Sequence, residues 1–275
     1  MIRTWVADVT SLLKKEKYLQ YYKKVPDFRK EKADKIICQE GKALSIGVWI
    51  LYEQMREAYD ISEDLVFNLS HSGHYALCSI TDIESNATYL GCDIEGVKQV
   101  RLDVARRFFC TSEFQRILEQ NTEEERAEEF YRYWVLKESF MKATRLGMKL
   151  GLDQFEIAFS KEGNPYLIKQ PEEFPQKYYF KEYEVADIPC KIAVCSNCGE
   201  FSNTIEKGMR SSKMWRYYSS LVERKVKRIR RTKRQLMAVG VGCLVLGLIS
   251  GNVFGGMRQK KKMEKRTKET IAEVR

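Results

Sequence analysis

The stretch that decides the fold is FYRYWVLKESFMK, Phe130 to Lys142. Its spacing predicts a helix, because Trp134, Glu138 and Lys142 recur every four residues and therefore share one side. Trp134 and Met141 suit a core, while Glu138 and Lys142 place opposite charges one turn apart beside it. An ordinary ion pair on a solvated helix would give the same pattern. The interpretation of this helix therefore depends on the stretches that accompany it.

A pair of acids in GCDIEGVK (91–98) points to a cation. Apolar residues alternate with Asp93 and Glu95, so on a strand both carboxylates point to one face. Two adjacent acids repel each other unless a cation lies between them, and hard oxygen ligands suit Mg²⁺. Glu138 can supply a third carboxylate from the central helix. An exposed strand end with two solvated acids explains this stretch equally well when it is taken alone.

A third stretch gives the pattern its specificity. FNLSHS (67–72), GCDIE (91–95) and WVLKESFMK (134–142) together resemble the 4'-phosphopantetheinyl transferases of the broad-range, surfactin-synthetase-activating type. That family reads roughly F-N-x-S-H-S, then G-x-D-x-E, then W-x-x-K-E-S-x-x-K. The resemblance covers about residues 1–198. It implies an α+β fold of two pseudo-twofold-related halves, each a small sheet with packed helices, and an active site between the halves.

The resemblance also implies an activity and a set of site residues. The reaction would be the Mg²⁺-dependent transfer of the 4'-phosphopantetheine arm of coenzyme A to a serine of an acyl or peptidyl carrier protein, with release of 3',5'-ADP. Mg²⁺ would be held by Asp93, Glu95 and Glu138. Catalysis would fall to Glu113 as general base, to Glu138, and to Lys142 beside the leaving group. The coenzyme A contacts would be Arg29, Lys32, Lys42, Ser70, His71 and Lys137.

Two departures from the family pattern leave an alternative open. Where relatives have an arginine before the next helix, this chain offers Lys42, which lacks the bidentate fork of arginine. The Gly-Lys-Pro turn of relatives is replaced by AYDISEDLV (58–66). Glu113 also fits an ordinary first-turn acid, with Thr111 or Ser112 as the N-cap. The alternative function is a membrane-bound interaction protein with a degenerate transferase body.

The charge of the chain is concentrated in its tail. The 275 residues carry a net charge of +10, with 48 Lys and Arg against 38 Asp and Glu. From residue 204 onward we count 20 against 5, a net of +15, which leaves 28 against 33, a net of −5, for residues 1–203. The body is therefore mildly acidic, and we expect no nucleic-acid partner.

The tail also contains an uncharged stretch, LMAVGVGCLVLGLISGNVFGGM (236–257). Its length suffices to span the hydrocarbon core of a membrane, although a buried helix of a soluble domain is the alternative. Glycines at every fourth position form a small-residue face of the kind on which membrane helices pack. We expect these divisions of the chain: transferase halves at 1–100 and 101–203, a basic linker or helix at 204–235, a transmembrane helix at 236–257 and a basic tail at 258–275.

The cysteines and the N-terminal residues indicate in which cellular compartment the protein resides. The chain has eight cysteines, and its first residues lack the long apolar region of a secretion signal. Cys195-Ser-Asn-Cys198 is a lone CxxC, which with Cys190 still lacks the fourth ligand of a structural zinc site. We therefore expect reduced thiols and a cytoplasmic catalytic body, anchored to the membrane by its C-terminal segment. The resemblance to the broad-range transferases implies a monomer.

The remaining elements follow from local patterns. Residues 1–9 are predicted as a strand, and residues 12–22 and 43–59 as helices with apolar faces. Residues 67–80 are predicted as a turn followed by a strand. Residues 81–95 are predicted to complete a hairpin-like pair with that strand.

Overall fold

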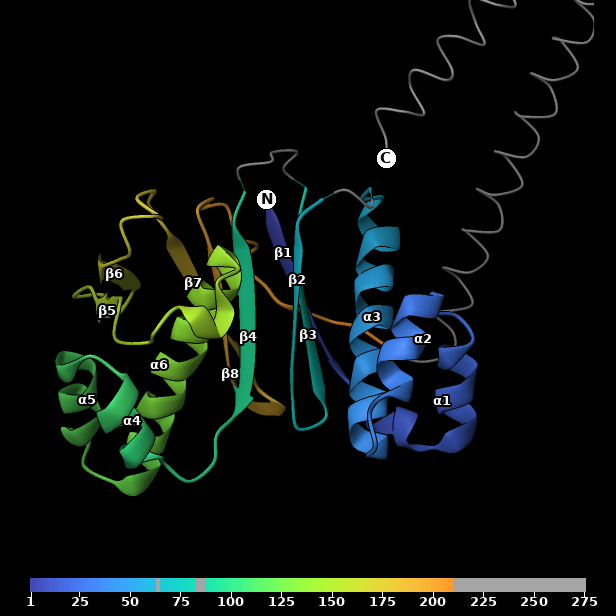
Figure 1. The fold of residues 1–275 in the computed structure, drawn as a ribbon, viewed down its shortest axis with the longest axis horizontal. Coiled ribbons are helices and arrows are strands. Elements are labelled where there is room, and N and C mark those ends of the chain that lie inside the picture. The colour runs from blue at the N-terminus through green and yellow to red at the C-terminus, as the bar shows by residue number, and fades with distance from the viewer. Residues whose placement is uncertain (63–64, 83–87, 210–275) are drawn as a thin grey trace, which may run out of the picture. The chain divides into compact units, whose positions relative to one another are not determined.

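The computed structural model describes residues 1–62, 65–82 and 88–209, which belong to one compact unit. Within these residues the fold is α+β, as expected, with two main sheets that each carry helices (Figure 1). The segments predicted at 236–257 and 258–275 lie outside the described residues, as does nearly all of 204–235. In the described part of the chain, no helix is both long enough and apolar enough to cross a membrane.

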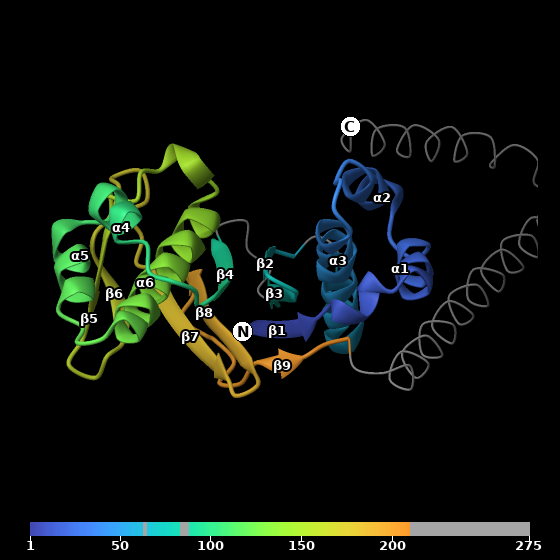
Figure 2. The same ribbon diagram turned by 90° about the horizontal axis from the view of Figure 1, so that it is seen from below.

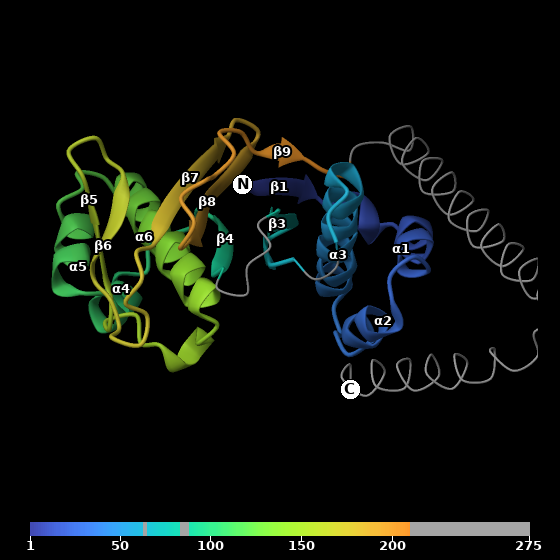
Figure 3. The same cartoon turned by 90° about the horizontal axis from the view of Figure 1, so that it is seen from above.

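The first sheet has the strand order β2-β3-β1-β9 and packs against the long helix α3. β1 is antiparallel to β3, and β3 is antiparallel to β2. Trp5 of β1, Leu51 and Met55 of α3, and Ile80 of β3 share one buried cluster. Figures 2 and 3 show α1 and α2 beside α3, on the side away from the sheet. The bounds are β1 Ile2–Asp8, α1 Lys15–Tyr22, α2 Asp27–Asp34, α3 Gln39–Tyr59, β2 Phe67–Ser72 and β3 Tyr75–Thr81.

The second sheet has the order β4-β8-β7 and packs against the central helix α6. Helix α6 begins after Thr122, whose hydroxyl accepts a hydrogen bond from the amide of Glu125 in a capping box. Of the two predicted core residues, Met141 is buried, and Trp134 is partly buried and packs against the same cluster. The bounds are β4 Leu90–Gly96, α4 Leu102–Phe108, α5 Thr111–Leu118, α6 Glu123–Thr144, β5 Glu156–Phe159, β6 Pro165–Lys169, β7 Tyr179–Val185 and β8 Ile188–Ser196.

The two sheets exchange strands across the predicted boundary at residue 100. β4 pairs antiparallel with β8, so the expected hairpin-like pairing of β3 with β4 is wrong. In return β9 (Glu206–Lys207) lies parallel to β1, and Met209 packs on the cluster around α3. The body therefore continues past residue 203: the N-terminal half supplies β4 to the second sheet, and the segment after residue 203 supplies β9 to the first.

Gly91 determines how closely β4 approaches α6. A Cβ atom at this position would overlap with the carbonyl oxygen of Ser139 and the amide nitrogen of Ala143, both backbone atoms of α6. Backbone cannot move aside as the end of a flexible side chain can. The absence of a side chain at Gly91 therefore lets α6 lie directly against β4, which carries the two predicted metal-binding acids.

We expect Gly91→Ala to lower the free energy of unfolding by about 3 kcal/mol or more, at the upper end for overpacked cores, because the obstructing atoms are backbone. Gly96→Ala on the same strand is the matched control, since its Cβ would come no closer than 3.9 Å to another atom, the Sγ of Cys190. Urea unfolding followed by tryptophan fluorescence measures both. Equal stability of the two variants would contradict the close approach.

Candidate functional site

Strands β2 and β4 are held side by side by their side chains. The hydroxyl of Ser70 donates a hydrogen bond to Oδ1 of Asp93 at 2.7 Å, and that of Ser72 donates to Oε2 of Glu95, also at 2.7 Å. Both serines point from β2 toward β4 because residues two apart on a strand share a face. Hydrogen bonds from Ser70 and Ser72 of β2 thus orient the two predicted acids of β4.

Helix α6 brings Lys142 to the same place. Its ammonium group lies 2.6 Å from Oδ1 of Asp93 and 2.9 Å from Oγ of Ser70, and it also donates to the carbonyl of Cys92 at 3.2 Å. Among the ion pairs of the described residues, Lys142 therefore pairs with Asp93 and not with Glu138 one turn before it. The intrahelical pair that the spacing allows is replaced by a contact between two distant parts of the chain.

Glu138 belongs to the same group of charges. Burial raises the pKa of Glu138, and the negative charges of Asp93 and Glu95 raise it further, while Lys142 opposes the rise. Burial also raises the pKa of Asp93 and the pKa of Glu95. Three carboxylates and one lysine give this cluster a formal charge of −2 when all are ionised. Burial is the first cause of all three raised values, so further positive charge beside the carboxylates would stabilise their ionised forms.

The cluster fits a divalent cation. Oδ2 of Asp93 is buried and has no hydrogen-bond partner among the described residues. A buried carboxylate oxygen without a partner costs free energy, which a hard cation bound to that oxygen would recover. In the same part of the chain, no three His, Cys, Asp or Glu side chains are already drawn together as a metal-binding group. The assignment of Mg²⁺ to Asp93, Glu95 and Glu138 stays a prediction.

Two of the residues predicted to bind coenzyme A are His71 on β2 and Arg29 on α2. Desolvation by the surrounding protein lowers the pKa of His71, and the charges of Lys142 and Lys32 lower it further, so the imidazole is neutral near pH 7. Arg29 is 8% exposed, its guanidinium lies 4.5 Å from the centre of the Trp49 ring, and its Nε has no partner among the described residues. A buried arginine of this kind calls for an anion.

Lys42 lies in the first turn of α3, where its side chain is partly exposed. No contact in the structure connects it to Arg29 or His71, and its role stays a prediction. Lys32 is exposed, and its effect on His71 places it within the electrostatic reach of β2.

Glu113 and Lys137 form a separate buried pair. The ammonium group of Lys137 lies 2.8 Å from Oε1 of Glu113 and donates to the carbonyls of Leu152 and Phe155 at 2.7 and 2.8 Å. Both side chains are 0% exposed. The carboxylate of Glu113 also accepts hydrogen bonds from the amides of Cys110 and Ile157, both at 2.9 Å.

This geometry corrects three predictions. Glu113 cannot reach a serine of another protein, because it is enclosed and its oxygens are engaged, so the general-base assignment does not fit. Lys137 cannot contact coenzyme A, because its three N–H donors are used inside the protein. The N-cap of α5 is Cys110, with Glu113 at N3 of a capping box, and not Thr111 or Ser112. Burial raises the pKa of Glu113 and lowers the pKa of Lys137, while their mutual attraction opposes both shifts.

Ser72 is the site residue that the sequence analysis missed. Within FNLSHS, Ser70 and Ser72 are two residues apart, which is the spacing that points both side chains to one face of a strand. The sequence analysis assigned Ser70 and His71 to coenzyme A and did not use this spacing. The hydroxyl of Ser70 contacts Asp93 and Lys142.

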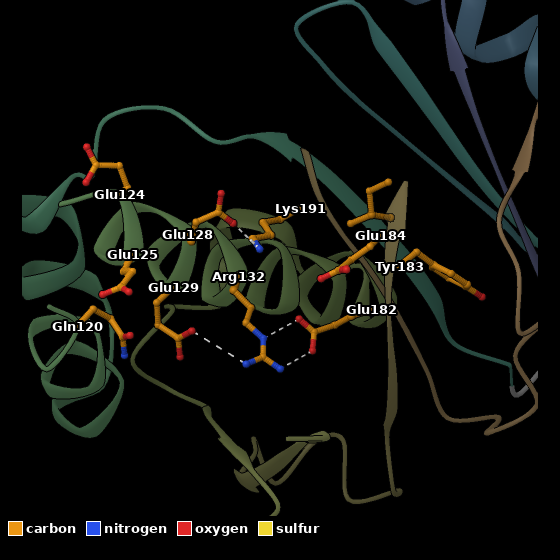
Figure 4. Close-up of a pocket in the computed structure, with 11 residues that line it drawn as sticks. Gln120, Glu124, Glu125, Glu128, Glu129, Arg132, Glu182, Tyr183, Glu184 and Lys191 are labelled. Atoms are coloured by element: carbon orange, nitrogen blue, oxygen red, sulfur yellow. Dashed lines mark hydrogen bonds and ion pairs between the residues drawn. The ribbon is translucent and has the colours of Figure 1, made fainter. Parts of the chain in front are cut away.

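An acidic pocket of about 630 Å³ lies along the first half of α6 and the edge of β7 and β8, apart from the carboxylate cluster (Figure 4). Arg132 forms a bidentate contact with Glu182 there, at 2.8 and 2.7 Å, and Lys191 pairs with Glu128. Among the described residues that line it, six glutamates face one arginine and one lysine, a net of −4. The lining glutamates are Glu124, Glu125, Glu128, Glu129, Glu182 and Glu184.

The protein has an α+β fold with a cluster of carboxylates and one lysine between β2, β4 and α6. A cluster of this composition is suited to binding a divalent cation together with a phosphate ester. Comparison with known families agrees, since residues 89–193 match the model of the 4'-phosphopantetheinyl transferase superfamily. The matched range contains two of the three sequence blocks on which the resemblance depends, GCDIE (91–95) and WVLKESFMK (134–142).

The chain is similar to named members of this superfamily. It is 34% identical over 145 residues to the 4'-phosphopantetheinyl transferase Sfp of Bacillus subtilis (strain 168), covering 52% of this chain and 59% of that protein. A second 4'-phosphopantetheinyl transferase of Bacillus subtilis is 31% identical over 146 residues, covering 52% and 60%. The chain thus spans about three fifths of the length of these curated relatives. A solved holo-[acyl-carrier-protein] synthase of Thermotoga maritima matches with a TM-score of 0.34 and 23% identity, over 39% of this chain and 61% of that one.

Proposed function

We propose that this protein transfers the 4'-phosphopantetheine arm of coenzyme A to a serine hydroxyl of a carrier protein and releases 3',5'-ADP. The observation that carries the proposal is the convergence of Asp93, Glu95, Glu138 and Lys142 from β4 and α6, in a stretch that matches the model of the transferase superfamily. The alternative, a degenerate interaction protein, is less favoured, because Lys142 pairs with Asp93 and the pKa of Glu138 responds to the charges of Asp93 and Glu95.

In the proposed reaction the serine oxygen forms a bond to the phosphorus nearest the pantetheine, and the proton of the serine hydroxyl passes to solvent water. The bond between that phosphorus and the bridging oxygen breaks, and the electron pair leaves with 3',5'-ADP. Asp93, Glu95 and Glu138 would hold Mg²⁺, which when bound supplies neutralisation of the negative charge on the phosphates. Ser70 and Ser72 keep the first two carboxylates aimed at the same face of β4.

The chain's own cations would bind and orient the phosphates. Lys142 has a short, charge-assisted contact to Asp93, which holds its ammonium group beside the cluster. Arg29 offers a buried guanidinium without an acidic partner in the described residues, a suitable ligand for the outlying phosphate. Desolvation first, and then the charges of Lys142 and Lys32, lower the pKa of His71, and a neutral imidazole can still donate one hydrogen bond without adding charge.

The test uses the full chain, coenzyme A, Mg²⁺ and several apo carrier proteins, followed by mass spectrometry of the carriers. We expect at least one carrier to gain the mass of one phosphopantetheine arm. We expect the gain to disappear with EDTA and to return with excess Mg²⁺, because the three carboxylates alone would repel the substrate phosphates. Coenzyme A binding without any transfer to the tested carriers would favour the degenerate interaction protein instead.

The anchor at 236–257 and the monomeric state stay predictions from the sequence. Partition of the full chain between membrane and soluble fractions tests the anchor, and recovery wholly in the soluble fraction would remove it.

A further inference from the structure

Strands β2 and β4 meet at the facing edges of the two sheets (Figures 1 and 2). In the part of the chain that the structure describes, side chains rather than a backbone ladder join them there. The amide of Cys92 donates a hydrogen bond to Oδ1 of Asn68 at 2.9 Å, and the thiol of Cys92 donates to the carbonyl of Asn68 at 3.3 Å. Together with Ser70 and Ser72, every second residue of β2 from Asn68 onward thus holds β4.

Strand β4 is fixed on its other edge as well. It pairs antiparallel with β8 along its whole length, and Asp93 and Glu95 lie opposite Ala193 and Lys191. Because both edges of β4 are held, the backbone that carries the two acids has little freedom to rearrange around a bound ion. Rigidity and the number of available ligands are two of the properties that separate Mg²⁺ sites from Ca²⁺ sites.

The hydroxyl of Ser70 is oriented as a donor to Asp93. The ammonium group of Lys142 has protons but no acceptor, so it donates to Oγ of Ser70 at 2.9 Å. The proton of Ser70 is then left for Oδ1 of Asp93, which also accepts a hydrogen bond from Lys142 at 2.6 Å. Oδ1 is therefore used twice, while Oδ2 is buried and has no partner among the described residues.

Ser72 has the same relation to Glu95. The amide of Gly96 donates to Oγ of Ser72 at 3.3 Å, so the hydroxyl proton is left for Oε2 of Glu95. Ser72 is 8% exposed, and water therefore competes little for this hydrogen bond. Oε1 of Glu95 takes part in no hydrogen bond or ion pair with any other described residue. Each acid of β4 thus has one oxygen engaged and one oxygen open.

A carboxylate with one engaged oxygen is suited to binding a cation through the other oxygen alone. Ca²⁺ takes about six to eight oxygen ligands and often uses both oxygens of a carboxylate, whereas Mg²⁺ needs a near-octahedral set and keeps several waters. To gain the second oxygen, Ca²⁺ would have to break a charge-assisted hydrogen bond from a serine. One oxygen from each acid therefore suits the smaller ion and leaves the larger one short of ligands.

We propose that Ser70 and Ser72 make the carboxylate cluster selective for Mg²⁺ against Ca²⁺, because each serine occupies one oxygen of an acid that Ca²⁺ would otherwise bind through both. This inference rests on the proposed function, which assigns a divalent cation to Asp93, Glu95 and Glu138. Glu138 forms no hydrogen bond or ion pair with the described residues, so the restriction comes from the serines of β2 and not from α6.

The test is Ser72→Ala, since Ser70 also contacts Lys142. Mn²⁺ is bound to the full chain with coenzyme A but without a carrier protein, so that no transfer occurs. Mg²⁺ or Ca²⁺ then displaces it, and free Mn²⁺ is measured by electron paramagnetic resonance, with a titration of coenzyme A alone as the reference. We expect the parent chain to prefer Mg²⁺, and we expect Ser72→Ala to lower the ratio of Mg²⁺ to Ca²⁺ affinity about tenfold, as is usual for partners of metal ligands.

Two variants serve as controls. Ser72→Thr keeps the hydroxyl and should keep the preference for Mg²⁺. Ser196→Ala removes a fully buried serine on β8, whose hydroxyl donates to the carbonyl of Tyr89 at 2.6 Å, away from the acids, and should leave the ratio unchanged. Should Ser72→Ala fold poorly, Ser72→Val replaces it, because valine has the shape of threonine without the hydroxyl.

The outcomes separate selection from a merely structural role. A loss of stability would weaken the binding of both ions, whereas selection changes the ratio of their affinities. Parallel loss of both affinities in Ser72→Ala would therefore overturn the proposal, as would a ratio equal to that of the parent. Equal affinity of the parent chain for the two ions would overturn it too. No binding of Mn²⁺ to the parent would remove the metal assignment and the inference together.

Failure of the proposed function has a different signature. If no carrier protein is modified, but the parent chain prefers Mg²⁺ and Ser72→Ala loses that preference, the inference stands without the transfer activity. If the parent chain modifies a carrier in the presence of Mg²⁺, but Ser72→Ala keeps the parent's preference, the function stands and the role of the serines in selection is removed.

Discussion

Replacing Glu138 by glutamine is expected to lower kcat/KM for transfer about a thousandfold or more, equivalent to about 4 kcal/mol of transition-state stabilisation. The change keeps the size of the side chain and removes the one carboxylate that α6 contributes to the cluster. Asp93 and Glu95 would remain on β4, but two ligands from one strand leave one side of the cation without protein oxygen. Mass spectrometry of the carrier over time measures the loss.

The same variant should be no less stable than the parent. The charge of Glu138 is opposed by burial and by Asp93 and Glu95, which raise its pKa, so a neutral amide removes repulsion from the folded state. Activity and stability therefore move in different directions, which a merely structural residue would not show. Glu128→Gln is the control, because Glu128 lies on the same helix but pairs with Lys191 at the acidic pocket. Near-normal transfer by Glu138→Gln would contradict the site assignment.

Lys137→Met is expected to lower the free energy of unfolding by about 3–5 kcal/mol, because it leaves the carboxylate of Glu113 charged and buried without its partner. Glu113→Gln should also destabilise, since it strands the ammonium group among the carbonyls of Leu152 and Phe155. The double variant should lose clearly less than the sum of the two, because no uncompensated charge remains. Urea unfolding followed by tryptophan fluorescence measures all three.

This set of variants decides between two roles for the pair. A structural pair predicts large losses of stability that are coupled in the double variant. A catalytic pair predicts that Glu113→Gln keeps the stability of the parent and loses transfer. The second result would restore the general-base assignment that the enclosed position of Glu113 argues against.

The parts of the fold that follow local rules could be predicted from the sequence. The helical spacing around Trp134 and Glu138 gave the central helix, and the alternation around Asp93 and Glu95 gave the strand with both acids on one face. These patterns depend on neighbours within a few residues, where side-chain direction is fixed by backbone geometry. The family resemblance then brought the separate stretches together as one site.

What the sequence could not reveal is the choice between distant partners. Lys142 has an acid one turn away on its own helix, yet it contacts Asp93, 49 residues earlier in the chain. Glu113 and Lys137 could each have faced the substrate, and only three-dimensional packing encloses them together. The pairing of β4 with β8 likewise depends on a strand nearly 100 residues away, so local turn chemistry favoured the wrong neighbour.

The exchange of strands between the sheets imposes an order on folding during synthesis. While the ribosome is still making α5, β4 has no β8 to pair with, and β1 keeps one bare edge until β9 emerges. Bare edges of this kind recruit other chains. The free edge of β1 is therefore covered only after the last described strand, β9, has been made. Growth conditions that slow translation between α4 and β8 lengthen the interval in which aggregation competes with folding.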